Sequence, residues 1–239
     1  MRLRHALLVG LAILATLAYA NAATATTWST GDVVAYAQDA WGLPGSTAAG
    51  LLIVNFDLLY PNPLEIGIPG PAGFSMRFFD AFAVFDYLPA GGPPFRLIAD
   101  LIDPTSSSSG VFGGNVLALQ LDVDFSDHGL LGGTAPFAFG DILLSNFTTL
   151  PDLNGLSVRQ FLAMVNIALG GGTTTDSIDD LDPVLFQLTL AFVNGVPTSF
   201  AQEHLVAPSS AVPEPSTLAL LGLGAVALGF GRRSVKRRP

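Results

Sequence analysis

Three aspartates near the middle of the chain are the residues best suited to bind a metal ion. Asp122, Asp124 and Asp127 are separated by one and by two residues, and Gly129 follows them. Calcium prefers several carboxylate oxygens gathered on a turn. The spacing departs from that of the EF-hand loop, however, and no glutamate closes it. The alternative is a solvated strand end, so we expect no cofactor beyond weakly bound calcium.

Four further aspartates form a second acidic group. Asp176, Asp179, Asp180 and Asp182 follow the threonines at positions 173–175. Short polar side chains of this kind accept hydrogen bonds from the first backbone N–H groups of helices. We expect this group to be a polar loop that caps a helix rather than a metal site.

Two tryptophans in the first quarter of the chain are candidates for stacking on sugar rings. Trp28 and Trp41 lie on either side of Tyr36, and aromatic faces offer large, rigid surfaces for such contacts. Seventeen of the aromatic residues are Phe, against four Tyr and two Trp, and this excess favours a packed core. The alternative is therefore that both tryptophans anchor the beginning of the domain in its core.

The remaining polar residues give little support for catalysis. Between residues 23 and 207, His128 and His204 are far apart in sequence, and Glu65 and Glu203 are the only glutamates. No G-x-S-x-G motif occurs, and the absence of cysteine excludes a thiol nucleophile and a Cys-ligated zinc site. We predict that the chain is not an enzyme. A secreted hydrolase that uses two carboxylates is the alternative.

The distribution of charge excludes nucleic acid as a partner. The formal net charge is −9, and most basic residues gather at the two ends of the chain. Between residues 23 and 212, only Arg77, Arg96 and Arg159 oppose eighteen acidic residues. Such a surface repels phosphate backbones.

The first 22 residues have the three parts of a secretory signal peptide. Arg2 and Arg4 form a positive segment, residues 6–18 form an apolar run, and small residues occupy the −3 and −1 positions before Ala23. The apolar run is short for a membrane span. We predict recognition by the export machinery and cleavage by signal peptidase before Ala23.

The C-terminus also has three parts in a fixed order. Pro213, Glu214 and Pro215 form a stiff extended element, which precedes an apolar segment over residues 216–231. As a helix this segment is roughly 24 Å long, somewhat less than the ~30 Å hydrocarbon core of a bilayer. We predict one transmembrane helix, and the long side chains of the neighbouring basic residues can snorkel to the membrane surface and make up the difference. The tail, residues 232–239, is predicted to be cytoplasmic, with the domain facing the periplasm. Its basic anchor residues are Arg232, Arg233, Lys236, Arg237 and Arg238.

Together these three parts resemble the PEP-CTERM sorting signal of exported bacterial proteins. The resemblance implies that an exosortase, a membrane-embedded cysteine protease or transpeptidase, recognises Pro213, Glu214 and Pro215. It also implies anchoring in the inner membrane, then processing and transfer to the envelope or extracellular matrix. The same tail is sometimes labelled as an ice-binding protein C-terminus, a name that concerns the tail alone.

Residues 23–207 are expected to form one domain, which a linker over residues 208–215 joins to the apolar segment. Apolar runs bounded by Gly, Pro and Ser predict strands. A mainly β domain is therefore expected, an antiparallel sandwich or jelly-roll-like barrel. The predicted strands are residues 51–60, 76–88, 95–102, 116–125 and 142–147.

The last third of this domain has a helical pattern instead. Apolar residues recur every three or four positions from Val158 to Leu169, with Ser157 and Gly170 as caps. A second helix is predicted to start at Asp182–Pro183 and to continue over residues 184–193, although the alternation there also permits a strand. The expected fold is thus a β-sandwich with two helices.

The sequence predicts a non-enzymatic protein of the cell envelope or extracellular matrix. The alternative is a carbohydrate- or calcium-binding adhesion module of an exopolysaccharide matrix, which depends on Trp28, Trp41 or the three central aspartates. The expected partners are the export machinery, signal peptidase, an exosortase-like enzyme and the membrane, with exopolysaccharide as a further partner of the adhesion module.

Overall fold

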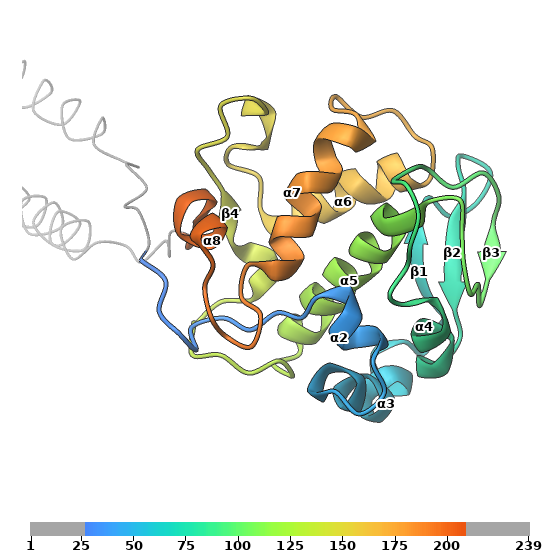
Figure 1. Ribbon diagram of the computed structural model, residues 1–239, viewed down its shortest axis with the longest axis horizontal. Coiled ribbons are helices and arrows are strands. Elements are labelled where there is room, and N and C mark those ends of the chain that lie inside the picture. Colours follow the sequence, from blue (N-terminus) through green and yellow to red (C-terminus); the bar gives the residue numbers. More distant parts are fainter. Residues whose placement is uncertain (1–26, 209–239) are drawn as a thin grey trace, which may run out of the picture. The chain divides into compact units, whose positions relative to one another are not determined.

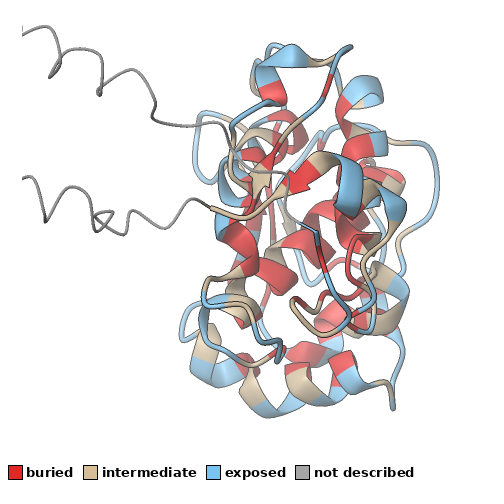
Figure 2. Ribbon diagram, turned by 90° about the vertical axis from the view of Figure 1, so that its left-hand side faces the viewer, coloured by how far each residue is buried: buried red, intermediate tan, exposed pale blue. Residues whose placement is uncertain are grey.

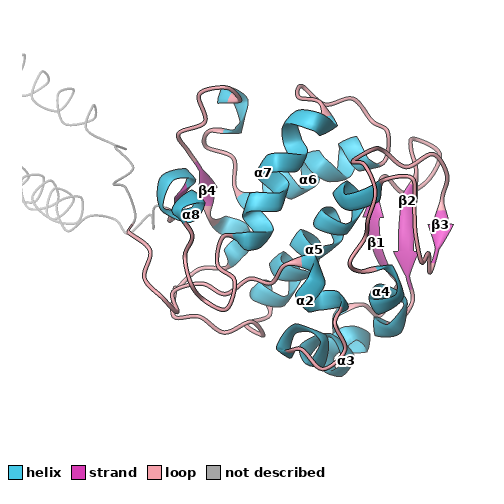
Figure 3. Ribbon diagram, viewed as in Figure 1, coloured by secondary structure: helices cyan, strands magenta, loops and turns pink. Residues whose placement is uncertain are grey.

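The computed structural model describes residues 27–208, and helices predominate in this stretch. It contains seven α-helices and two small sheets, as Figure 3 shows. The expected mainly β sandwich is therefore wrong. The α-helices are α2 (Gln38–Gly42), α3 (Thr47–Leu59), α4 (Ala81–Tyr87), α5 (Gly110–Asp127), α6 (Val158–Leu169), α7 (Ile178–Leu190) and α8 (Ser199–His204). The strands are β1 (Leu64–Gly67), β2 (Ser75–Phe78), β3 (Leu101–Ile102), β4 (Leu143–Leu144) and β5 (Leu205–Val206), and the short 3-10 helices are η1 (Phe139–Asp141) and η2 (Pro151–Leu153).

Helix α5 is the centre of the fold. It runs through the middle of the domain, and α2, α6, α7 and the first sheet pack around it (Figure 1). Thirteen of its 18 residues are buried, and they lie on every side of the helix. A helix that is apolar all round is stable only when other elements enclose it. Figure 2 shows buried residues concentrated in the middle of the domain. Glycine allows the close approach, because a Cβ at Gly114 would collide with Gln38 and Ala90.

The two sheets are small and lie at opposite sides of α5. In the first sheet β1 pairs with β2 in antiparallel register, with Leu64 opposite Phe78, and β3 joins β2 in parallel. The buried side chains of β1 and β2 complete one wall of the core. In the second sheet β4 pairs antiparallel with β5, with Leu143 opposite Val206.

The helix predicted over residues 158–169 is confirmed as α6. Ser157 accepts a hydrogen bond from the backbone N–H of Gln160, and the Gln160 side chain accepts one from the backbone N–H of Ser157. This capping box satisfies two donors that the first turn would otherwise leave unpaired. Gly170 is the C-cap, as predicted.

Helix α7 confirms the second predicted helix but begins earlier than predicted. Ser177 and Asp180 form its capping box, so the helix starts at Ile178 and Pro183 lies inside it. The predicted start at Asp182–Pro183 is therefore wrong, because the Ser177–Asp180 pair caps the chain one turn before the proline.

Three of the predicted strands are largely helical. Residues 51–60 belong mainly to α3, and residues 116–125 lie wholly within α5. In the segment 76–88 only the first three residues are strand, since the Asp80 side chain accepts a hydrogen bond from Ala83 and starts α4. The predicted strands at 95–102 and 142–147 shrink to the two-residue strands β3 and β4.

Among the helices of residues 27–208, none is both long enough and apolar enough to cross a membrane. The predicted signal peptide (1–22), transmembrane helix (216–231) and basic tail (232–239) lie outside the described residues. The same holds for the Pro-Glu-Pro element at positions 213–215.

Candidate functional site

The three central aspartates lie on α5, where each has different partners. Asp122 is fully buried, and its Oδ1 accepts hydrogen bonds from the backbone N–H of Tyr36 (2.9 Å) and from Nε1 of Trp41 (3.2 Å). Its other oxygen, Oδ2, has no hydrogen-bond partner among the described residues. Burial raises the pKa of Asp122 well above its ordinary range, although the two N–H donors act in the opposite direction.

Asp124 points away from Asp122, because two residues along a helix correspond to a turn of about 200°. Its Oδ2 accepts a hydrogen bond from the Tyr60 hydroxyl at 2.9 Å, and both its oxygens accept from Nε2 of Gln120. Burial raises the pKa of Asp124, and the hydrogen bonds from Gln120 and Tyr60 lower it in part. Burial and the neighbouring carboxylate also raise the pKa of Tyr60, so this phenol remains protonated.

Asp127, at the end of α5, forms an ion pair with Arg159 on α6. The guanidinium donates to both carboxylate oxygens at 2.7 Å, and it also donates to Asp141 at 3.4 Å. The bidentate geometry fixes the end of α5 against the start of α6. The hydrogen bond to Asp127 is the main reason why the pKa of Arg159 is raised.

The structure thus does not bring the three candidate calcium ligands together. Asp122 points to the opposite side of the helix from Asp124, and Asp124 and Asp127, one turn apart, accept hydrogen bonds from separate protein donors. Across residues 27–208, no group of three or more His, Asp or Glu side chains could hold a metal ion.

Both tryptophans proposed for sugar stacking are buried. Trp28 is 4% exposed, and its ring makes edge-to-face contacts with Phe137 and Phe192. Trp41 is fully buried and contacts Tyr36 and Phe125. Neither ring face is open to a sugar, and both rings anchor the beginning of the domain in the core.

Two members of the second acidic group take part in helix capping and in a partly buried polar network. Asp180 belongs to the capping box of α7, and Asp182 accepts a hydrogen bond from Nδ2 of Asn115 at 3.3 Å. Asn115, on α5, in turn accepts one from Nε2 of Gln38 at 3.1 Å. Burial raises the pKa of Asp182. This network could not be predicted from the sequence, because its three side chains come from α2, α5 and α7.

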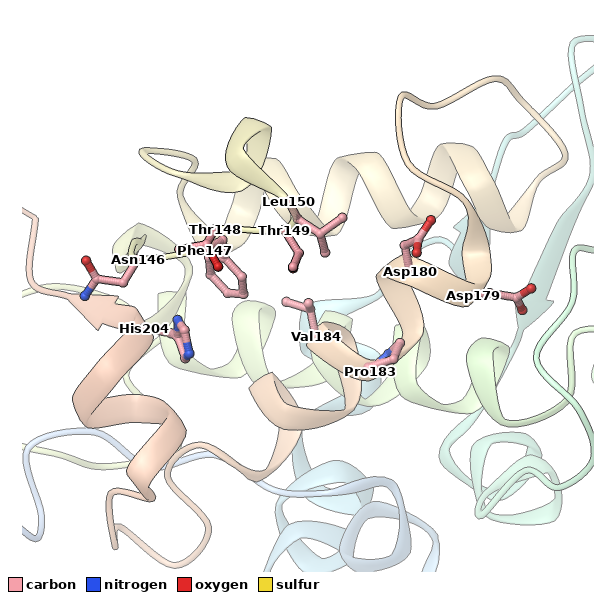
Figure 4. A pocket seen from close by; sticks show the side chains of 10 residues that line it. All are labelled: Asn146, Phe147, Thr148, Thr149, Leu150, Asp179, Asp180, Pro183, Val184 and His204. Carbon is pink, nitrogen blue, oxygen red and sulfur yellow. The ribbon is translucent and has the colours of Figure 1, made fainter.

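A pocket of about 410 Å³ opens between the loop after β4, the start of α7 and α8 (Figure 4). The rings of Phe147 and His204 lie at one end with their centroids 4.6 Å apart, and Asp179 and Asp180 lie at the other. Its size suits a small ligand. None of the binding residues predicted from the sequence lines it.

The two ends of the described chain are joined by what we call the terminal clamp, formed by Trp28, Gln202 and Leu205. Gln202 accepts a hydrogen bond from the backbone N–H of Trp28 and donates one to its carbonyl oxygen. Nε1 of Trp28 donates to the carbonyl oxygen of Leu205 at 2.9 Å. The first and last described segments consequently lie side by side (Figure 1).

The C-terminal residues match a known family model. Residues 211–238 match the PEP-CTERM protein-sorting motif. No curated protein and no solved structure matches the chain. The chain therefore carries a PEP-CTERM sorting motif, which implies an exported protein that transits the membrane and is processed by an exosortase-like membrane enzyme.

Proposed function

We propose that this chain is a non-enzymatic protein of the cell envelope or extracellular matrix, delivered there by its C-terminal sorting motif. The match over residues 211–238 carries the proposal. It includes Pro213, Glu214 and Pro215, the apolar segment and the basic tail in the order that a sorting signal requires.

In this proposal the tail is a substrate and the chemistry belongs to the exosortase-like enzyme. The two prolines keep the recognition segment extended, because they fix φ and remove two backbone donors, and Glu214 supplies one negative charge. The apolar segment holds the chain in the inner membrane, and the basic residues keep its end in the cytoplasm. Cleavage at or near the Pro-Glu-Pro element then releases the domain from the periplasmic side.

The terminal clamp supports this sequence of events. All its hydrogen bonds join residues between Trp28 and Leu205, inside the signal peptidase site before Ala23 and the Pro-Glu-Pro element. Removal of both ends leaves these bonds in place, so we expect the released domain to keep its fold.

The placement of the polar residues supports a role without catalysis. The aspartates and tryptophans considered for binding engage in hydrogen bonds and core contacts within the domain. Glu65, one half of the considered carboxylate pair, accepts a hydrogen bond from Ser75 at 2.6 Å. An adhesion role toward exopolysaccharide or calcium would have to use other residues.

The direct test replaces Pro213, Glu214 and Pro215 by Ala in the full chain, expressed in its own host. We expect the variant to be exported and folded but to keep its C-terminal segment, as intact mass after membrane extraction would show. Ser209→Ala with Ser210→Ala is the matched control, because both positions precede the matched motif, and it should mature normally. Normal maturation of the triple variant would contradict the proposal.

A further inference from the structure

Helix α3 presents an apolar face to solvent. Ala48, Leu52 and Phe56 point into the core, but Val54 is 79% exposed and Leu58 75% exposed on the opposite side. The helix is thus apolar on both sides although only one side is covered. An apolar surface left open in this way marks a site of interaction.

Nothing inside the domain explains the glycine in the N-terminal half of this face. Gly50 lies one turn before Val54, its φ is helical, and a Cβ built there would meet no atom within 4 Å. Glycine weakens a helix interior relative to alanine. No atom of the domain thus requires a glycine here, and the missing side chain leaves a notch in which another helix could approach closely.

The face is complementary to a second copy of itself. In an antiparallel pair related by two-fold symmetry, Val54 and Leu58 of one copy face the half of the other helix that contains Gly50. The exposed Asp57 lies in the C-terminal half of α3, where a negative charge is unfavourable for its own helix. The antiparallel arrangement moves that charge toward the positive N-terminal half of the partner helix.

We propose that α3 is the interface of a homodimer, in which two copies pack antiparallel through Gly50, Val54 and Leu58. Helix α4 lies beside α3 (Figure 1), and two further apolar side chains, Leu43 before α3 and Phe82 on α4, are 62% and 65% exposed. A helix of 13 residues is only about 20 Å long, so the interface is smaller than a standard one and the dimer is concentration-dependent.

A lipid surface fits the same face less well. No Lys or Arg occurs between residues 5 and 76, so the face lacks the cations that bind anionic headgroups and anchor amphipathic helices. It carries Asp57 instead.

The absence of cysteine allows a test with one thiol in each copy. Val54→Cys places the thiol on the α3 face, and Val196→Cys places it on another exposed surface, where Val196 is 54% exposed against 79% for Val54. Each full-length variant is purified in detergent and treated with a short bis-maleimide. We expect Val54→Cys to form a product of twice the chain mass at least five times more efficiently than Val196→Cys.

The control variant Val196→Cys has the same C-terminal segment as Val54→Cys. Association through that segment would therefore raise the crosslinking yields of both variants equally. Gly50→Leu, added to Val54→Cys, fills the notch from a position where a Cβ enters open space, and it should reduce crosslinking to the level of Val196→Cys. Equal crosslinking at positions 54 and 196, or no effect of Gly50→Leu, would overturn the homodimer. A third result would also overturn the homodimer: the Val54→Cys chain is monomeric, and phosphatidylcholine vesicles protect its thiol from reaction with maleimide. That result would assign the face to lipid.

Discussion

Helices α5 and α3 are both rich in apolar residues, yet they occupy opposite environments. Helix α5 is enclosed on all sides, and its polar residues Asn115 and Asp122 have specific partners in the interior. Helix α3 lies at the edge of the domain and leaves Val54 and Leu58 open to solvent. Apolar composition alone therefore does not locate a helix. What distinguishes the two is whether each side chain has neighbours within the same domain.

Truncation of a leucine on each helix should give the largest difference. Leu121→Ala on α5 removes a fully buried side chain and should lower the free energy of unfolding by about 2–5 kcal/mol, because it leaves a cavity. Leu58→Ala on α3 should change it by less than about 0.5 kcal/mol in the monomer. Urea denaturation of both variants measures the free energy of unfolding. Equal losses of this free energy in the two variants would contradict the comparison between α5 and α3.

Removal of an aspartate from each helix should give the next largest effect. Asp122→Ala leaves the Trp41 indole N–H and the Tyr36 backbone N–H without an acceptor in the core, which should cost about 2–4 kcal/mol. Asp57→Ala on the exposed face of α3 is the matched control and should be nearly neutral. A neutral Asp122→Ala would mean that the buried carboxyl does not support the core.

Glycine-to-alanine changes should differ in sign between the two helices. Gly114→Ala on α5 should destabilise the domain by about 1–3 kcal/mol, because the new methyl group would collide with Gln38 and Ala90. Gly50→Ala on α3 should stabilise the monomer by about 0.5–1 kcal/mol, since its Cβ enters open space. The melting temperatures of the two variants, measured at low protein concentration, test this difference: Gly114→Ala should melt below the parent chain and Gly50→Ala above it.

The pH dependence of stability should give the smallest effect. Burial raises the pKa values of Asp122, Asp124 and Asp182 above the ordinary 3.8, so the folded protein binds more protons than the unfolded chain above that pH. Their contribution to stability is fully present below pH 3.8 and is lost as pH rises through the raised values. The melting temperature should therefore rise as the pH is lowered from 7 toward 3.8, and about 1 kcal/mol of regained stability corresponds to roughly 2–4 °C.

Asp122→Asn sharpens this last prediction, because it keeps an acceptor for Trp41 and removes one titrating group. The rise in melting temperature on acidification should be smaller in this variant than in the parent chain. An unchanged rise would show that folding does not raise the pKa of Asp122.

The sequence predicted those parts of the fold that local signals determine. The helical stripe from Val158 to Leu169 and the cap at Ser157 are sufficient to locate α6, because an amphipathic helix shows the periodicity of its buried face. The sorting motif was also recognisable, since it is a linear pattern of three segments.

Helix α5 could not be found in this way. An enclosed helix has no polar face, so its apolar residues lose the helical period, and Gln120, Asp122 and Asp124 created an alternation that resembled a strand. The predicted calcium ligands are not brought together for the same reason. On a strand Asp122 and Asp124 would share a face, whereas on a helix they point in different directions. Their partners Trp41 and Tyr60 lie far away in sequence and could not be inferred from it.

The central claim is that the protein is an exported domain from which both ends are removed. The intact mass of the protein, isolated from its own host with and without the exosortase-like enzyme, tests it most directly. We predict a chain from about Ala23 to near Val212 when the enzyme is present, and a chain that keeps its C-terminal segment when it is absent. If the protein kept its C-terminal segment both with and without the enzyme, the result would contradict the account and indicate a permanently anchored protein.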